Sequence, residues 1–396
     1  MMKKEILIFG AGALSLGFLG PELSKDYQIT FIDREYKSDF LAYLKRENRY
    51  RLNISFPQLK VTEIDNVTGL NLDNPEQKAL LIDKISRVPI IFTAVGSSHL
   101  KSVASILAKG IRERKSKDSL FILCSENGWN IEALMESYLK EYISDLSSSV
   151  KIGNPIMGRM CRCEENVKKE GVYQSVADDF NWAVIAEPWY GIPLVESIAK
   201  DKVFFGRAFQ AKGEREFSAL KRMKFLLHNG THAFLSHLGY LKGYSHFYQL
   251  AEEKELLRLA HKMMNDEIIR ALLSNYPDVL DENEVNNYAI DILRRILCPV
   301  FKDSIERGVR GSLEKLKPEE RLISGAKFII SSGFLPEVYS MMIAAAIEIN
   351  KKEGRLKGSL ERILSDYCQL KGDKDKRIIE LVKKNLRTIS SVAVVG

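Results

Sequence analysis

Residues 220–232 combine basic, amide and imidazole side chains within an otherwise apolar segment, Leu-Lys-Arg-Met-Lys-Phe-Leu-Leu-His-Asn-Gly-Thr-His. We expect a helix here, and at ~100° per residue Lys224, Asn229 and His232 fall within one arc of about 140°. A lysine amine can exchange a proton with a hydroxyl group, while an amide and an imidazole can hold an oxygen whose charge changes. The three residues therefore predict carbonyl or alcohol chemistry that requires no metal.

Each of these residues also has an ordinary structural interpretation. Lys224 could be a solvated helix lysine, Asn229 with Gly230 could end a helix, and His232 could be a core histidine with satisfied hydrogen bonds. Taken alone, the segment fits that interpretation better. The chemical hypothesis therefore depends on the elements that position these side chains.

The chain begins with a pattern typical of dinucleotide binding. Residues 5–9 form an apolar run that predicts a strand, followed by a glycine turn and the start of a helix. Gly10 permits the turn, Gly12 lets backbone N–H groups approach a pyrophosphate, and the helix presents its positive N-terminus to that anion. The third position of the fingerprint is serine. The residues predicted to bind the cofactor here are Gly10, Ala11, Gly12, Ala13, Leu14 and Ser15.

A second predicted strand, residues 28–32, ends in Asp33 and Arg34. An acid about twenty residues beyond the glycines can bind the hydroxyls of the adenosine ribose. An arginine just after the acid could instead accept a 2′-phosphate. Because the carboxylate would repel that phosphate, we expect NAD to be preferred over NADP.

Two further apolar runs, residues 88–96 and 119–124, read as buried parallel strands, the first followed by a helix over 99–112. The carboxyl ends of such strands line the cofactor crevice. We therefore predict cofactor contacts from Thr93, Ala94, Val95, Gly96 and Glu126. Asn127 reaches the same edge, although it could equally be a turn asparagine before a glycine. Residues 150–157 and 182–186 predict the last strands, with an exposed hairpin or loop over 164–170.

From about residue 217 the pattern changes to apolar residues at helical spacing. We predict an α/β fold with a Rossmann-type, mostly parallel sheet in residues 1–195, followed by an all-α domain in residues 196–396 that binds substrate. The helices are expected near 217–241, 245–273, 284–297, 318–332, 335–353, 359–370 and 377–386.

Lys-x-x-x-x-Asn-x-x-His resembles the signature of the polyol-specific long-chain dehydrogenases, a family that includes mannitol-1-phosphate 5-dehydrogenases, mannitol 2-dehydrogenases and hexuronate reductases. Other segments are similar to this family in the same order along the chain. They are the glycine turn with residues 17–20, Thr-Ala-Val-Gly at 93–96, Glu126-Asn127, Glu187-Pro188-Trp189-Tyr190, and a basic loop at 301–316 followed by Arg321-Leu322-Ile323. The chain departs from the family pattern at Gly158, Ser312 and Glu314, where aspartate, proline and arginine are common.

The resemblance implies an NAD-dependent polyol dehydrogenase, with greatest similarity to the mannitol-1-phosphate 5-dehydrogenase branch, which forms fructose 6-phosphate. Lys224 would be the general base, with a pKa lowered from ~10.4 toward neutrality. Asn229 and Asn127 would stabilise the alkoxide, His232 would orient the substrate, and Glu187, Arg307 and Arg310 would contact it. A hexuronate reductase, a mannitol 2-dehydrogenase and a non-catalytic NAD-binding sensor remain alternatives.

The composition agrees with an anionic ligand such as a dinucleotide or a sugar phosphate, whereas a polyol or sugar phosphate as the substrate is what the resemblance implies. The net charge of +7 is spread along 396 residues, which is too diffuse to indicate nucleic acid but favours anionic ligands. No apolar run reaches the ~20 residues that span a membrane, and the N-terminus does not read as a signal peptide. Five cysteines, of which only Cys161 and Cys163 are close, indicate reduced thiols and no metal site. We expect a cytoplasmic monomer or homodimer.

Overall fold

The computed structural model describes residues 3–56, 58–116, 118–188 and 191–392. The chain forms two compact units, Met1–Phe217 and Ser218–Gly396, and each is described by itself. The division falls later than the expected boundary between residues 195 and 196. The reason is that β11 (Ile192–Val195) pairs in parallel with β12 (Phe209–Lys212), which keeps the segment beyond residue 195 in the first unit.

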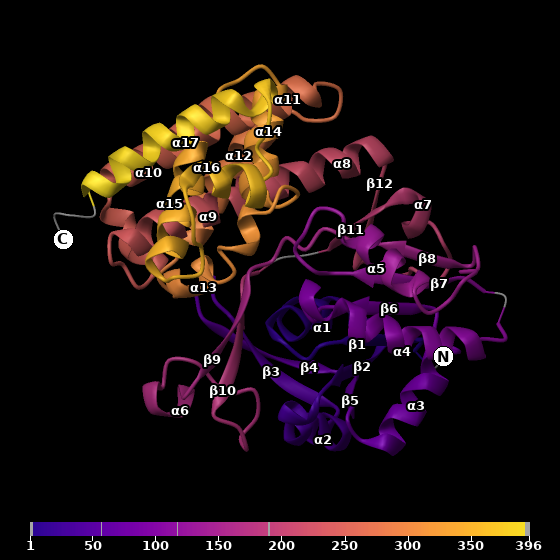
Figure 1. Cartoon of the computed structure of the whole chain (residues 1–396). Helices are drawn as coiled ribbons and strands as arrows, with labels where there is room; N and C mark the ends of the chain where they lie inside the picture. The colour runs from indigo at the N-terminus through magenta and orange to yellow at the C-terminus, as the bar shows by residue number, and fades with distance from the viewer. Residues whose placement is uncertain (1–2, 57, 117, 189–190, 393–396) are drawn as a thin grey trace. The chain divides into compact units, whose positions relative to one another are not determined.

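The first unit is built on a parallel sheet, as predicted (Figure 1). Its strands are β1 (Glu5–Phe9), β2 (Gln28–Asp33), β5 (Val67–Asn71), β6 (Ile90–Thr93), β7 (Leu120–Cys124) and β8 (Val150–Gly153). Their order, β5-β2-β1-β6-β7-β8, is that of a doubly wound dinucleotide-binding sheet, in which the strand order reverses next to β1. Every neighbouring pair is parallel.

Both faces of this sheet are buried. Successive side chains of each strand point to opposite sides and enter two different hydrophobic cores. Ile6 and Ile8 belong to one hydrophobic core, and Leu7 and Phe9 belong to another. The helical elements of this unit are η1 (Ser15–Leu19), α1 (Gly20–Leu23), η2 (Glu35–Lys37), α2 (Ser38–Glu47), α3 (Pro75–Ile85), η3 (Ser97–His99), α4 (Leu100–Glu113), α5 (Ile131–Lys140), α6 (Val167–Glu170) and α7 (Glu196–Ala199).

A second, four-stranded sheet corrects one part of the prediction. It has the order β4-β3-β10-β9 and is made of β3 (Arg49–Ile54), β4 (Lys60–Asp65), β9 (Cys161–Glu165) and β10 (Trp182–Ala186). We expected β10 to extend the parallel sheet, but it pairs antiparallel with β9 and parallel with β3. The predicted exposed segment over 164–170 contains the end of β9 and α6. A charged edge strand that is buried only at its start is difficult to distinguish from a loop.

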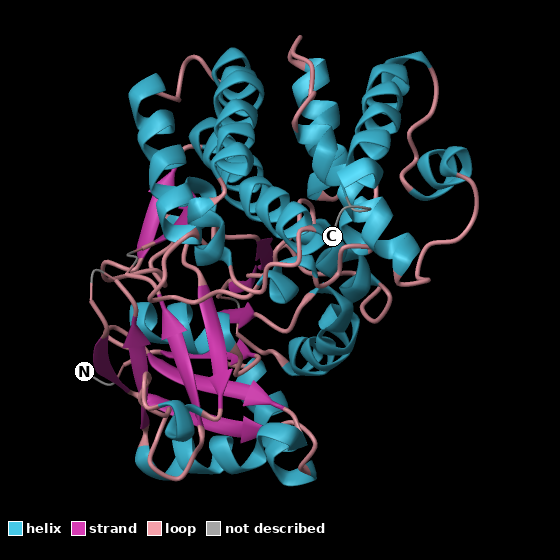
Figure 2. Cartoon of the chain, turned by 90° about the vertical axis from the view of Figure 1, so that its left-hand side faces the viewer, coloured by secondary structure: helices cyan, strands magenta, loops and turns pink. Residues whose placement is uncertain are grey.

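The second unit is built of helices, as predicted, and appears in cyan in Figure 2, whereas the strands of the first unit are magenta. Its helical elements are α8 (Glu214–Met223, which begins in the first unit), η4 (Lys224–His228), α9 (Asn229–Leu241), η5 (Phe247–Glu252), α10 (Lys254–Lys262), η6 (Met263–Ile269), α11 (Arg270–Asn275), α12 (Glu282–Ile296), α13 (Ile305–Val309), η7 (Glu314–Leu316), α14 (Arg321–Ser331), α15 (Tyr339–Lys352), α16 (Leu360–Arg362), η8 (Ile363–Tyr367) and α17 (Asp373–Val392). Several predicted helices are therefore present as unbroken runs in which a π-helical turn separates two α-helical parts. Among the described helices, none is long and apolar enough to cross a membrane.

The basic segment at 301–316 is partly helical, whereas the sequence predicted a loop. Ser304 begins α13, because its hydroxyl accepts a hydrogen bond from the backbone N–H of Arg307 at 3.2 Å. A short 3₁₀ turn, η7, follows the glycine at residue 311, which has φ +67°. This region therefore holds its charged side chains on ordered backbone.

Candidate functional site

The glycine turn after β1 has the geometry that the sequence predicts. Gly10 has φ +99°, and a Cβ atom there would lie 2.5 Å from the backbone oxygen of Ala94. Only glycine fits this position without moving the neighbouring loop. A Cβ atom at Gly12 would meet nothing within 4 Å, so the backbone is open there to a close ligand. The turn can therefore cradle a pyrophosphate between two glycines with different structural roles.

The helix after this turn packs closely through glycines that follow the fingerprint. Ser15 is fully buried, and its hydroxyl has no hydrogen-bond partner. A Cβ atom at Gly17 would lie 2.8 Å from Cys161 Sγ, and one at Gly20 would lie 2.2 Å from the hydroxyl of Tyr50. Close packing of this helix therefore relies on Gly17 and Gly20, whereas a small buried side chain is tolerated at position 15.

Asp33 lies at the end of β2 beside the glycine turn, where an acid that binds ribose hydroxyls is expected. Its side chain is 8% exposed. Oδ2 accepts a hydrogen bond from the backbone N–H of Ala11 at 2.7 Å, and Oδ1 accepts one from the N–H of Arg34 at 2.8 Å. These bonds fix the carboxylate next to the open backbone at Gly12. The residues of this edge therefore fit a dinucleotide.

Glu126 ties together the ends of β6 and β7. Its Oε2 accepts a hydrogen bond from the Thr93 hydroxyl at 2.7 Å, and its Oε1 accepts one from the Val95 N–H at 3.0 Å. Burial raises the pKa of this carboxyl, while the hydrogen bonds act in the opposite direction. Glu126 thus holds the Thr93–Gly96 loop in place, with Ala94 half-buried and Gly96 exposed. Asn127 follows directly and is exposed at the same edge.

The Glu187 side chain joins the ends of two strands of the second sheet. It is buried, and its Oε2 accepts a hydrogen bond from the N–H of Met160 at 2.9 Å. Arg159, where the family often has arginine after aspartate, donates from Nη1 to the carbonyl of Gly17 at 2.7 Å. Trp189 and Tyr190 of the predicted Glu-Pro element lie outside the described residues.

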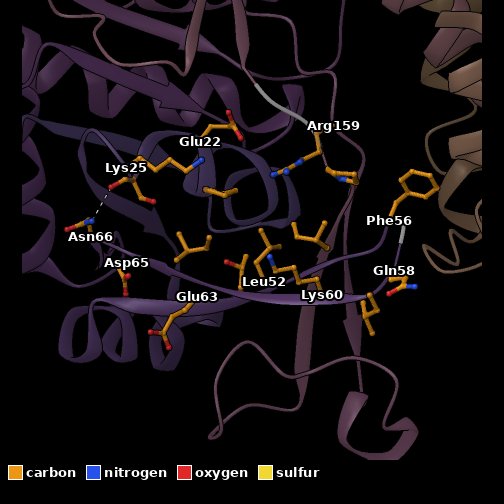
Figure 3. A pocket seen from close by; sticks show the side chains of 17 residues that line it. Glu22, Lys25, Leu52, Phe56, Gln58, Lys60, Glu63, Asp65, Asn66 and Arg159 are labelled. Carbon is orange, nitrogen blue, oxygen red and sulfur yellow. Dashed lines mark hydrogen bonds between the residues drawn. The ribbon is translucent and has the colours of Figure 1, made fainter. Parts of the chain in front are cut away.

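A cavity of about 890 Å³ lies between the end of α1 and the β3–β4 hairpin (Figure 3). Lys25 and Arg159 point into it, and Asn66 is held at its edge by a hydrogen bond to the carbonyl of Ser24 at 3.1 Å. Its lining includes residues that follow α1 and that precede β5, at the amino end of the parallel sheet. Ligands of doubly wound sheets bind beyond the carboxyl ends, and none of the predicted cofactor residues lines this cavity. It therefore does not belong to the dinucleotide site.

In the second unit, Lys224 begins the π-helical turn η4 between α8 and α9. The backbone N–H of Asn229 donates to the carbonyl of Lys224, which is an i to i+5 bond. This wider turn brings residues five apart one above the other, so Lys224 and Asn229 are closer on the helix surface than a regular α-helix would place them. The predicted arc of about 140° assumed a regular helix. Single π turns of this kind occur frequently at functional sites.

Lys224 is positioned to exchange a proton near neutral pH. Burial and, to a lesser extent, the positive charge of Arg321 lower the pKa of its amine to about 7. The expectation that burial shifts this lysine toward neutrality agrees with this value. Asn229 is buried beside it.

His232 belongs to a network that the sequence prediction did not include. Its Nε2 lies 3.1 Å from Oδ2 of Asp303, and its ring packs against Phe247 with the ring centroids 4.4 Å apart. Asp303 also accepts a hydrogen bond from Arg307 Nε at 2.6 Å, and its side chain is 1% exposed. Burial acts to raise the pKa of Asp303, but the hydrogen bonds from His232 and Arg307 outweigh it and hold this pKa well below its usual range. Asp303 therefore stays ionised and orients both partners.

Two more cations lie in this part of the second unit. Lys315 donates from Nζ to the carbonyl of Gly308 at 2.5 Å, and burial lowers the pKa of its amine to about 7. The side chain of Arg321 is 14% exposed, and its Nε is buried with no hydrogen-bond partner. The nearby charge of Arg321 contributes to the lowered pKa values of both Lys224 and Lys315. In the sequence, only the basic character of the 301–323 segment indicated that Lys315 and Arg321 could belong to the site.

The remaining candidate residues of the second unit lie in different surroundings. His228 is buried, and burial lowers its pKa well below the usual value, so it stays neutral. Arg307 joins the His232 network through Asp303, whereas Arg310 is exposed and lines a different cavity of about 580 Å³ together with Tyr240 and His246. The two arginines that sequence analysis grouped therefore face different surroundings.

We find no metal-binding arrangement within the part of the chain that the structure describes. There, no group of three or more His, Cys, Asp or Glu side chains could hold a metal ion. The five cysteines are free thiols, and Cys161 is buried whereas Cys163 is exposed.

Known proteins resemble this chain over nearly its whole length. The family model for the mannitol dehydrogenase Rossmann domain matches residues 4–152, and that for the mannitol dehydrogenase C-terminal domain matches residues 216–383. A mannitol-1-phosphate 5-dehydrogenase of Caldanaerobacter subterraneus is 28% identical over 360 residues, which cover 88% of this chain and 87% of the relative. One of Shouchella clausii is 25% identical over 95% of this chain and 98% of the relative.

Among solved structures, the Pseudomonas fluorescens mannitol 2-dehydrogenase in a ternary complex with NAD and D-mannitol has a TM-score of 0.75 at 15% identity, covering 100% of this chain and 93% of the other. A D-sorbitol dehydrogenase in substrate-free form has a TM-score of 0.67 at 15% identity, covering 98% and 95%. These two likenesses concern the fold. Together with the two family models, which match in the expected order on either side of the division between the units, they agree with the resemblance read from the sequence. The chain belongs to the mannitol dehydrogenase family of oxidoreductases.

Proposed function

We propose that this protein is an NAD-dependent mannitol-1-phosphate 5-dehydrogenase, which interconverts mannitol 1-phosphate and fructose 6-phosphate. The observation that carries the proposal is Lys224, a half-buried lysine with a pKa of about 7 at the start of a π turn, in the first position of the Lys-x-x-x-x-Asn-x-x-His pattern. The relatives with this name match most of the chain.

Lys224 acts as the general base in oxidation and the general acid in reduction. Its neutral amine accepts the proton of the substrate hydroxyl while a hydride leaves the carbon that bears this hydroxyl. When bound, the nicotinamide supplies the acceptor for that hydride. In the reverse direction the ammonium group returns the proton to the carbonyl oxygen. A pKa near the working pH lets one side chain serve both directions.

Asn229 and His232 hold the oxygen that changes charge. An amide N–H can donate to the developing alkoxide, and an imidazole fixed by Asp303 at 3.1 Å can direct its other nitrogen to the substrate. We include Asn127 as a second amide donor, and Glu187, Arg307 and Arg310 as further substrate contacts.

The cofactor proposal depends on the edge of the parallel sheet. The Gly10–Ser15 turn would hold the pyrophosphate and Asp33 the ribose hydroxyls, while Arg34, the Thr93–Gly96 loop and Glu126 would line the crevice. Asp33 is buried and fixed by two backbone N–H groups, which supports NAD over NADP.

The buried cations of the second unit support an anionic substrate. Burial lowers the pKa of both Lys315 and Arg321, and although Glu320, 3.9 Å from Arg321, acts in the opposite direction, both pKa values stay lowered, so a bound anion would be favourable here. A sugar phosphate provides such an anion. The same cations would also suit the carboxylate of a hexuronate, so a hexuronate reductase is the second candidate.

A substrate panel tests the proposal. Purified protein with NADH should reduce fructose 6-phosphate, with kcat/KM at least about tenfold above that for fructose, since a charged contact contributes ~1.5–3 kcal/mol. Fructuronate and tagaturonate are the comparison substrates. Preferred turnover of either one would replace the proposed substrate with a hexuronate. Tight NADH binding without turnover of any of these compounds would support a sensor.

A further inference from the structure

Arg34 directly follows Asp33, and an arginine near this acid can accommodate the 2′-phosphate of NADP. In this protein, however, Arg34 already pairs with another residue. Asp73, two residues beyond the end of β5, accepts hydrogen bonds from Arg34 Nε at 3.2 Å and from Arg34 Nη2 at 2.9 Å. It also accepts the backbone N–H of Glu35 at 3.0 Å. A guanidinium group and a backbone N–H just after the β2 acid are the donors that a 2′-phosphate would need.

The position of Asp73 is fixed by the strand pairing and by the loop that follows β5. Asp33 and Asn71 are partners in the β2–β5 register, and the N–H of Leu72 donates to the carbonyl of Asp33 at 2.8 Å. The N–H of Asp73 donates to the side-chain oxygen of Asn71 at 2.9 Å. These bonds hold the backbone at Asp73 without Arg34, and the Glu35 N–H is a second donor that holds the carboxylate besides the Arg34 guanidinium.

We propose that Asp73 is a specificity-determining residue that takes the place of the 2′-phosphate of NADP and so directs the protein to NAD. It satisfies Arg34 and the Glu35 N–H with a carboxylate, and its charge repels a 2′-phosphate. This inference rests on the proposed cofactor class, and it explains how an arginine after the acid is compatible with a preference for NAD.

The side chain of Arg34 is 61% exposed and that of Asp73 is 33% exposed, so the ion pair is screened by water and salt. Exposed ion pairs hold their partners only weakly. Removal of Asp73 should therefore release Arg34 without a large effect on folding. The carboxylates of Asp33 and of Glu35, which accepts a hydrogen bond from Asn71, then remain to oppose NADPH.

The test compares binding of NADH and NADPH, which differ only in the 2′-phosphate, to wild-type protein and to Asp73→Ala. The readout is the fluorescence of the bound nicotinamide at fixed ionic strength, without any sugar substrate. Asp73→Ala should bind NADPH about tenfold more tightly than wild type, while its affinity for NADH changes by less than about twofold. In Arg34→Ala/Asp73→Ala most of the gain should be absent, because the released donor is missing.

Asp83→Ala is the matched control. Asp83, on α3, pairs with Arg87, two residues after the end of that helix, in another exposed arginine–aspartate ion pair of the same unit, and its removal should leave the ratio of NADPH to NADH affinity unchanged. If Asp73→Ala does not fold, Asp73→Asn, which keeps the shape and removes the charge, should give a smaller gain in the same direction.

The inference fails if the affinity ratio is the same in wild type and Asp73→Ala, or if the double variant keeps the full gain. Failure of the proposed function would look different: wild-type protein would then fail to reduce fructose 6-phosphate, which the binding ratio does not measure, and only a wrong cofactor class would leave it binding neither NADH nor NADPH.

Discussion

Lys224 is the residue on which the proposed chemistry depends, and Lys224→Met tests it. Loss of a general acid or base should lower turnover by roughly 10²- to 10⁴-fold. Because oxidation requires the neutral amine, the wild-type oxidation rate should rise with pH through an ionisation near the pKa of about 7. The reduction rate should fall with pH through the same ionisation, because it requires the ammonium form. This ionisation should be missing from both pH profiles of the variant.

Lys221→Met is the control for this variant. Lys221 lies three residues earlier, on α8, and its replacement should leave turnover and the pH profile near those of wild type. NADH binding should also change little in Lys224→Met. More than about a tenth of wild-type turnover with an unchanged pH profile would show that Lys224 is not the general base.

Asp303 is a positioning residue, because it acts through His232 and Arg307. In Asp303→Asn the volume is kept, but the carboxylate that accepts bonds from both partners is lost. Hydrogen bonds to a charged group contribute about 1.5–3 kcal/mol, so KM for fructose 6-phosphate should rise by at least roughly tenfold. We expect a smaller fall in kcat and an unchanged KM for NADH. A role limited to folding predicts instead a lower melting temperature with unchanged kinetic constants of the remaining folded protein.

Glu306→Gln provides the comparison for Asp303→Asn. Glu306 is an exposed acid on the same short helix α13, so its removal changes the local charge by the same amount. Equal effects of the two substitutions on KM would assign the change to net charge and contradict a positioning role of Asp303.

The residues of the candidate site differ in how far sequence could reveal them. Lys224, Asn229 and His232 lie within nine consecutive positions, so their shared helix face follows from helical periodicity. Asp303 contacts His232 across 71 positions in the chain, and such a contact leaves no local pattern. Arg321 resembles any surface arginine in sequence, and its burial is apparent only after folding.

At the scale of elements, we predict different effects of substituting the two glycines of the turn after β1. Gly10→Ala forces a side chain into a positive φ and against the Ala94 oxygen. This costs at least about 1–2 kcal/mol, so the melting temperature should fall and NADH affinity should drop at least roughly tenfold. Gly12→Ala meets no protein atom within 4 Å. It should keep the wild-type melting temperature and weaken only NADH binding.

Thermal denaturation and NADH fluorescence titration of both variants check this prediction. Equal loss of stability in Gly10→Ala and Gly12→Ala would contradict the assignment of the turn to Gly10 and of the ligand approach to Gly12.

The elements that sequence analysis placed correctly are those with a strong local pattern. The uninterrupted apolar runs of β1, β6 and β7 predict buried strands, and the amphipathic periodicity predicts the helices. The same apolar run in β10 could not reveal which sheet it joins. Alternation of Tyr50, Leu52 and Ile54 with polar residues could have indicated β3. The π turn at Lys224 could not be predicted, because no local composition distinguishes it from a regular helix.

At the scale of the whole molecule, two separate patterns in the chain correspond to two compact units. The change from strand-rich to helical periodicity near residue 217 coincides with the division at Phe217. The parallel pair β11–β12 explains why the first unit continues beyond the last predicted strand. Contacts between distant segments thus fix the division, whereas local patterns fix the character of each unit.

From the net charge of +7 we predict that the whole protein attracts its anionic substrate and that salt weakens this attraction. A field from positive charge accelerates the encounter with an anionic ligand, and salt screens it over a distance that falls from ~30 Å at 0.01 M to ~10 Å at 0.1 M. At saturating NADH, kcat/KM for fructose 6-phosphate should therefore fall roughly three- to tenfold between these two salt concentrations, while kcat stays constant.

Two comparisons separate this long-range attraction from other effects of salt. Neutral fructose is not attracted by this field, so its kcat/KM should stay constant over the same range. An equal fall for both sugars would show that salt acts on the protein itself.

Lys45→Gln/Lys109→Gln removes two exposed charges outside the candidate site. If the diffuse charge contributes, this variant should have a lower kcat/KM than wild type for fructose 6-phosphate at 0.01 M salt and the same value at high salt, where screening removes the difference. An unchanged salt dependence in that variant would contradict a contribution of these two distant lysines and favour charges nearer the candidate site, such as Lys315 and Arg321, as the source of the attraction.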